Sequence, residues 1–189
     1  MRDKIQDKLL ESIQVKEELM RNSIDQIIQI ANYAIDCLKK GGKIILFGNG
    51  GSAADSQHLA AEFVGRFQKD RKALAAIALT TDTSILTSLA NDYGYEIIFA
   101  KQVEALGNRN DVAVGISTSG KAKNVIQGIK KAKEMNLGTI ALTGGDGGIL
   151  AKIADVSLIV PSKITARIQE AHITVGHIIC ELAEEVLCE

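Results

Sequence analysis

The sequence predicts an α/β protein with a doubly wound, five-stranded parallel sheet flanked by helices. Three observations favour this class: short unbroken apolar runs, Gly-, Ser- or Thr-rich turns after them, and helical patterns in between. Unbroken apolar runs are typical of strands covered on both faces, and their alternation with helices favours parallel pairing through right-handed crossovers. No low-complexity linker or repeat divides the 189 residues, so we expect a single domain over residues 1–189.

The expected elements follow in order along the chain. Apolar positions at helical spacing predict two helices within residues 1–40, which divide near residues 21–23 and stop at Gly41-Gly42. The expected strands are residues 43–47, 74–79, 112–116, 139–142 and 156–160. Pro161, the only proline, ends the last strand, and a final helix is expected from about Thr165 to Val186.

The amino-terminal helices, residues 1–40, carry more apolar positions than the cover of one sheet requires. Two interpretations are open. The surplus is either an outer layer of the monomer or a helical interface between copies of the chain. The sequence alone does not show which face is left over.

Charge and composition disfavour several classes of partner. The net charge is −1, from 22 basic and 23 acidic residues without a block of like charge, so nothing indicates a nucleic-acid or membrane-surface partner. Cys37, Cys180 and Cys188 are odd in number and form no CxxC pair, which disfavours a disulfide framework and a thiolate zinc site. With no apolar signal core and no run near the ~18 residues of a membrane span, we expect a soluble, cytoplasmic protein.

Two Gly- and Ser-rich turns are candidate phosphate sites. They are residues 49–52, Asn-Gly-Gly-Ser, and residues 117–120, Ser-Thr-Ser-Gly. Each follows an expected strand and leads into a helix amino terminus, which offers free N–H groups; Ser52 is placed to cap its helix, and Lys121 or Lys123 could add charge. Either turn alone is more often an ordinary connection, and the absence of GxGxxG and GxxxxGK[ST] disfavours dinucleotides and nucleoside triphosphates.

Two helices carry side chains that could bind a metal or a substrate oxygen. His58 and Glu62 are four residues apart and share one helix face, although such a pair is more often a surface contact. On the last helix, Gln169 and His177 share a drifting face about 12 Å apart along the axis, so they meet one ion with extended side chains or across two subunits. The alternative for His177 is a buried structural histidine, and for His172 a surface residue.

Five segments in combination resemble a known family. They read GNGGSAADSQHLAAEFVGRF, SLANDYGYEIIFAKQVEALG, GISTSGK, LTGGDGG and ARIQEAHITVGHII, and they span nearly the whole chain. In this order they are similar to the signature segments of bacterial phosphoheptose isomerases, which are sedoheptulose 7-phosphate isomerases with the sugar isomerase (SIS) fold.

The resemblance implies an enzyme that converts sedoheptulose 7-phosphate to D-glycero-D-manno-heptose 7-phosphate. It implies one Zn²⁺ per subunit and a homotetramer with active sites between subunits. The implied metal ligands are His58, Glu62, Gln169 and His177, with Glu62 also the catalytic base and His177 the acid. The expected substrate-binding residues, which include Ser52 of the first turn, are Asn49, Gly50, Gly51, Ser52, Glu62, Asn91, Asp92, Ser117, Thr118, Ser119 and Gln169.

Two positions depart from the family pattern. Ala122 stands where a further polar residue often follows the STSG turn, and Ala166 stands where some members are acidic. Phosphate binding is therefore expected to depend more on Lys121 or on backbone amides, and the surroundings of Gln169 are expected to differ.

The residues suit the chemistry of a ketose-aldose isomerase. The reaction needs a base, a proton donor and stabilisation of an enediolate, and Glu62, His177 and a metal ion can fill these roles. Two alternatives stay open. One is a non-catalytic SIS protein that acts by binding, although such relatives lack residues matching Glu62 and His177. The other is an isomerase for a different phosphosugar, because the turns recognise phosphate and not chain length.

Overall fold

The structure, a computed structural model, describes residues 1–188 and contains a five-stranded parallel sheet with the strand order β2-β1-β3-β4-β5. The strands are β1 (Ile44–Gly48), β2 (Ala76–Ala78), β3 (Val112–Ser117), β4 (Gly138–Gly144) and β5 (Val156–Val160). Every neighbouring pair is parallel. The predicted class and sheet are therefore confirmed.

The helices alternate with these strands as predicted. They are α1 (Arg2–Asn22), α2 (Ile24–Lys39), α3 (Gly51–Val64), α4 (Thr83–Tyr93), the 3₁₀ turn η1 (Tyr95–Ile97), α5 (Ile98–Leu106), α6 (Lys123–Glu134), α7 (Leu150–Ile153) and α8 (Thr165–Leu187). Ser23 separates α1 from α2, within the expected break. Among the helices of residues 1–188, none is both long and apolar enough to span a bilayer.

The edge strand β2 is shorter than the predicted strand 74–79. Its pairing with β1 covers only Ala76 to Ala78. Leu74, two residues before β2, is held elsewhere, because its N–H donates to the backbone oxygen of Phe63 at the end of α3 (3.0 Å). An edge strand has one neighbour, so its apolar run can leave the ladder without opening the sheet.

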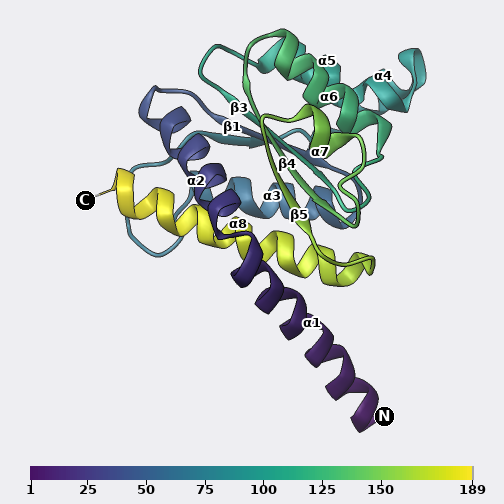
Figure 1. The fold of residues 1–189 in the computed structure, drawn as a ribbon. Coiled ribbons are helices and arrows are strands. Elements are labelled where there is room, and N and C mark those ends of the chain that lie inside the picture. The colour runs from purple at the N-terminus through teal and green to yellow at the C-terminus, as the bar shows by residue number, and fades with distance from the viewer. Residues whose placement is uncertain (189) are drawn as a thin grey trace.

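Helices cover both faces of the sheet, as a doubly wound fold requires (Figure 1). The helices α2, α3 and α8 pack on one face, and α5, α6 and α7 pack on the other. Strand β1 shows the division: Ile44 and Leu46 belong to the first layer, whereas Ile45 and Phe47 belong to the second. This alternation explains why the strand reads as an unbroken apolar run.

Two glycine-rich loops interlock at the carboxyl edge of the sheet. The turn after β3 ends at Gly120, which has a positive φ of 62°. A Cβ at Gly120 would overlap the backbone of Gly147 in the loop after β4, and the N–H of Leu150 donates to the Gly120 oxygen (3.0 Å). The loop after β4 therefore supports the shape of the turn after β3.

Helix α1 extends away from the sheet and its layers (Figure 1). Leu19 is its only buried residue, whereas its side chains at five apolar positions are more than half exposed: Ile5 (55%), Leu9 (61%), Leu10 (53%), Ile13 (51%) and Met20 (63%). Helix α2 instead buries an apolar face against the sheet. Helix α2 is therefore part of the outer layer of the monomer, whereas much of the apolar surface of α1 stays exposed in the single chain.

A buried ion pair joins the chain after α3 to α8. The carboxylate of Glu184, 2% exposed, accepts the backbone N–H groups of residues 67–69 and the Nε–H of Arg71 (2.8 Å). The Arg71 guanidinium also donates to the backbone oxygens of Glu62 and Phe63 (2.9 Å each). The pair thus ties the end of α3, the following loop and α8 together.

We expect Glu184→Gln to lower the melting temperature at neutral pH and to flatten its dependence on acid. Burial opposes the charged form, but the three backbone N–H groups and Arg71 outweigh it and lower the pKa of Glu184 from 4.5 to about 2. A carboxyl with a depressed pKa stabilises the fold above its unfolded pKa, and this contribution is lost as the pH falls toward the folded value. Thermal unfolding measured from pH 7 downward tests this, and equal acid sensitivity in both proteins would contradict it.

Candidate active site

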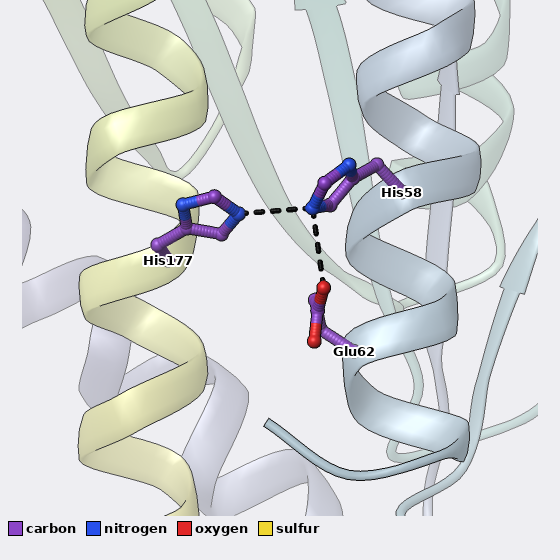
Figure 2. Close-up of side chains that lie close together, drawn as sticks. All are labelled: His58, Glu62 and His177. Atoms are coloured by element: carbon purple, nitrogen blue, oxygen red, sulfur yellow. Dashed lines mark hydrogen bonds and ion pairs between the residues drawn. The ribbon is translucent and has the colours of Figure 1, made fainter. Parts of the chain in front are cut away.

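Three predicted side chains, His58, Glu62 and His177, meet between α3 and α8 (Figure 2). The Nε2 atom of His58 lies 3.1 Å from Oε1 of Glu62 and 3.0 Å from Nε2 of His177. The helices can approach closely here because Gly176 has no side chain. A Cβ at this position would overlap the side chain of Leu59. His58 is half exposed, so the cluster is accessible from solvent in the single chain.

The cluster can hold a divalent cation. Its ligand atoms all lie within 4.8 Å of one another. An imidazole whose proton is on Nδ1 presents a lone pair at Nε2, and the Nε2 atoms of His58 and His177 are the ring nitrogens that face each other here. Two imidazole nitrogens and one carboxylate oxygen are a typical donor set for catalytic zinc, with a further position left open. The residues therefore fit such an ion.

Two neighbours of the cluster escaped the sequence analysis. The ring of Phe67 lies against that of His177, with 5.5 Å between centroids. Asp55, one turn before His58 on α3, has a buried Oδ2 without a hydrogen-bond partner among the described residues. Burial raises the pKa of Asp55, while the charges of His58 and His177 oppose the rise. The spacing of Asp55 from His58 and Glu62 was the available signal, since positions i, i+3 and i+7 share a helix face.

A pocket of about 340 Å³ at the carboxyl edge of the sheet joins the two predicted turns. It is lined by Asn49, Gly50, Gly51, Ser52, Ile116, Ser117, Thr118, Ser119, Ala122, Thr165 and Gln169. The amide of Gln169 packs against Gly51, where a Cβ would not fit. Both α3 and α8 start at this pocket, with His58 about two turns into α3 and His177 rather more than three turns into α8, which links the pocket to the cluster.

Asn49 is held by two residues that the sequence analysis missed. The side-chain amides of Asn49 and Asn124 exchange two hydrogen bonds, of 2.9 and 2.8 Å. The hydroxyl of Tyr95 donates to Oδ1 of Asn49 (3.0 Å). Asn124 lies 75 positions from Asn49 and has no recognisable motif, so only the folded chain reveals the pair.

The structure corrects the expected cap of α3. The helix begins at Gly51, its N-cap is Gly50 with a φ of 56°, and no side chain caps it. Ser52 therefore lies inside the first turn, buried and beside the pocket. Gly50 takes the cap position because its positive φ turns the chain sharply between β1 and α3.

The lysines after the second turn do not line this pocket. Lys121 pairs with Asp146 (3.4 Å) in an adjacent cavity, and Lys123 pairs with Glu96 (2.7 Å). The lysine expected to compensate for Ala122 thus has an acidic partner elsewhere. The polar side chains that the two turns place along the pocket are the Asn49 amide and the hydroxyls of Ser52, Ser117, Thr118 and Ser119.

Asn91 and Asp92 lie outside the pocket within one chain. Both are exposed at the end of α4, where Nδ2 of Asn91 donates to Oδ1 of Asp92 (2.8 Å). Their predicted contact with substrate therefore stays a prediction.

The alternative interpretations of the two histidines on α8 were a surface position for His172 and a buried structural role for His177, and the structure shows neither. His172 is buried (1% exposed), and its Nε2 lies 2.9 Å from the backbone oxygen of Thr143. Burial lowers the pKa of His172 to about 4, against the smaller opposing effect of this hydrogen bond. His172 is therefore neutral near pH 7 and donates to Thr143, whereas His177 is only partly buried, within the cluster.

Comparisons with known proteins identify relatives over nearly the whole chain. Residues 9–144 match the family model of the SIS domain. A phosphoheptose isomerase from Aquifex aeolicus is 56% identical, over 100% of this chain and 99% of that protein. The solved phosphoheptose isomerases of Neisseria gonorrhoeae (TM-score 0.92, 47% identity) and Francisella tularensis (0.93, 39%) each cover 97% of this chain, over 98% and 97% of their own lengths.

We expect the protein to bind one Zn²⁺ per chain and to lose this ion in His58→Ala. The variant removes the imidazole that faces both Glu62 and His177. Dialysis against Zn²⁺ followed by elemental analysis gives the stoichiometry. The matched control is His172→Asn, which changes a histidine outside the cluster and should bind zinc like the wild type. Equal zinc content in the wild type and His58→Ala would contradict the assignment.

Proposed function

Since the chain belongs to the SIS-domain family of phosphoheptose isomerases, and is thus a phosphosugar isomerase, we propose that it converts sedoheptulose 7-phosphate to D-glycero-D-manno-heptose 7-phosphate. One observation carries the proposal: His58, Glu62 and His177 meet on the two helices that begin at the phosphate-type pocket. A proton-transfer cluster and an anion-binding pocket are the two parts that a phosphosugar isomerase needs.

Glu62 and His177 are assigned the proton transfers. Moving the carbonyl from C2 to C1 requires that a base remove a proton from C1 while an acid protonates the C2 oxygen, which gives an enediol. Glu62 is the base, and returns the proton to C2 after the O1 proton has been removed. His177 is the acid and exchanges protons with the oxygens. Glu62 Oε1 and His177 Nε2 lie 3.1 and 3.0 Å from Nε2 of His58. This proximity supports their acting on neighbouring atoms of one substrate.

We assign zinc to His58, Glu62 and His177, with Gln169 as a further ligand. When bound, the ion supplies Lewis-acid stabilisation to a negatively charged substrate oxygen. The donor set of the cluster supports this assignment. The place of Gln169, on the face of α8 that lines the pocket, supports a position between the cluster and the sugar.

The phosphate is assigned to the pocket end formed by residues 117–120. Ser117 ends β3, Thr118 and Ser119 follow it before α6, and Ser52 also lines the pocket. Hydroxyl and N–H groups at such a turn satisfy several phosphate oxygens at once. The sugar then extends past Asn49, Gly50 and Gly51 toward the cluster.

We also propose that the protein is a homotetramer built on residues 1–40, with active sites between subunits. The apolar side chains of α1 support this, because Ile5, Leu9, Leu10 and Ile13 are each more than half exposed in the single chain. The exposed positions of Asn91 and Asp92 suit contact with the substrate of a neighbouring subunit.

A cytoplasmic location is part of the same proposal. All three cysteines are free, and Cys37 and Cys180 are buried. Free buried thiols suit a reducing compartment, in which sugar phosphates are also made and used.

The direct test is to incubate zinc-loaded protein with sedoheptulose 7-phosphate and to follow the aldose product by NMR. Other ketose phosphates of shorter chain, tested in parallel, distinguish a heptose isomerase from an isomerase of another phosphosugar. Binding without turnover of any of them would favour a non-catalytic SIS protein and would overturn the proposal.

Glu62→Gln should retain the fold and substrate binding but lose about 10²- to 10⁴-fold in kcat, the usual scale of general acid-base catalysis. An amide of the same shape cannot accept the C1 proton. The matched control is Glu181→Gln on α8, whose carboxylate accepts a hydrogen bond from Gln68 (3.2 Å) outside the cluster; this variant should turn over normally. Near-normal kcat in Glu62→Gln would mean that the His58–Glu62 pair is only a surface contact.

The tetramer is tested by light scattering at micromolar concentration. Leu9→Asp combined with Ile13→Asp should lower the mass without unfolding the chain, because both side chains are more than half exposed in the single subunit. Ile149→Asp, at an equally exposed position (53%) outside α1, is the control. A monomeric wild type would refute the proposed assembly.

A further inference from the structure

We propose that Asn124 is a positioning residue that fixes the amide of Asn49 so that it offers the substrate a hydrogen-bond donor, and that Tyr95 reinforces this orientation. The inference rests on the proposed function in one respect, the identity of the substrate in the pocket. It concerns two residues that do not line that pocket.

The orientation of Asn124 is set by the backbone. Its Oδ1 lies 2.9 Å from the N–H of Val125, in the first turn of α6. A backbone N–H can only donate, so the oxygen and not the nitrogen of the Asn124 amide must face Val125. The nitrogen of Asn124 then occupies the other position and has to donate.

The orientation of Asn49 follows from that of Asn124. Because Oδ1 of Asn124 accepts, the atom of Asn49 that faces it at 2.9 Å is the nitrogen, Nδ2. Nδ2 of Asn124 correspondingly donates to Oδ1 of Asn49 at 2.8 Å. The Tyr95 hydroxyl donates to the same oxygen (3.0 Å), so both acceptor positions of that oxygen are in use.

One polar position of Asn49 is left for a ligand. Its Nδ2 has two N–H groups, and within residues 1–188 only one of them has a partner. Asn49 lines the pocket, so the chemistry available there is donation and not acceptance. The ligand group that fits is an oxygen that accepts, such as the carbonyl or hydroxyl oxygen of a sugar, and the fit improves as that oxygen gains negative charge.

Burial makes this orientation costly to reverse. Asn124 is 3% exposed, so a flipped amide would place its nitrogen against the Val125 N–H without water to compensate. Tyr95 is 59% exposed and can exchange its bond to Asn49 for water. Asn124 therefore has the dominant effect and Tyr95 a smaller one.

The main test is Asn124→Asp. The carboxylate has the same shape, still accepts from Val125, and is favoured at a helix amino terminus, which offsets part of the cost of burying its charge, so the variant should fold with a lowered melting temperature. It cannot donate to Oδ1 of Asn49, so the orientation of Asn49 is released. We expect kcat/KM for sedoheptulose 7-phosphate to fall by about 10- to 100-fold, the scale of a hydrogen bond to a partly charged group. An unchanged kcat/KM would overturn the proposal.

A double-mutant cycle separates positioning from a general structural role. If Asn124 acts through Asn49, then Asn124→Asp should add no further loss of kcat/KM in an Asn49→Ala background. A purely structural residue would cost the same factor in both backgrounds. Additive losses would therefore contradict the proposal.

Tyr95→Phe is the second variant, and Tyr93→Phe is its matched control. The Tyr93 side chain is similarly exposed (67%), and its hydroxyl has no hydrogen-bond partner within residues 1–188. We expect a loss of a few-fold in kcat/KM for Tyr95→Phe and none for Tyr93→Phe. Equal values for the two variants would remove Tyr95 from the proposal.

A neutron structure of the deuterated protein tests the orientation without reference to activity. Deuterium atoms on the Asn49 nitrogen that faces Oδ1 of Asn124 would support the proposal, and the reversed amide would overturn it. If the wild type failed to isomerise sedoheptulose 7-phosphate, the proposed function would fall, but this measurement would still decide how Asn124 holds Asn49.

Discussion

The close approach of α3 and α8 at Gly176 is the contact on which the site depends. Because this position has no side chain, Leu59 of α3 can pack directly against the backbone of α8. The two histidines of the cluster are sequence neighbours of this contact: His58 precedes Leu59, and His177 follows Gly176. A larger residue at position 176 would separate the helices and, with them, two imidazoles that now lie 3.0 Å apart.

Much of the fold could be predicted because its signals are local. Apolar runs covered on both faces, helical spacing and glycine stops together predicted five parallel strands and the break at Ser23. The shared face of His58 and Glu62 follows from the helix repeat alone. Local signals were weaker for the start of α3, because the helix begins two residues earlier than a Ser52 cap predicts, with Gly50 at a positive φ in the cap position.

The rest of the site depends on contacts that no local pattern encodes. Asn124 meets Asn49 across 75 residues, and Glu184 binds the backbone of the loop after α3 across more than 110 residues. The environments of His172 and His177 depend on which side of α8 faces β4 and which faces α3. Resemblance to a family can align such residues, but their partners appear only when the chain is folded.

The interlocked loops after β3 and β4 have a consequence for how such a pocket can be re-engineered. Gly120 and Gly148 each lie so close to the other's loop that neither tolerates a Cβ without movement of the opposite backbone. A transplanted serine-rich turn would therefore lose its shape on a scaffold that lacked the matching second loop. The two loops therefore act as one structural unit. Variant libraries designed to alter the anion selectivity of the pocket should exchange both loops together.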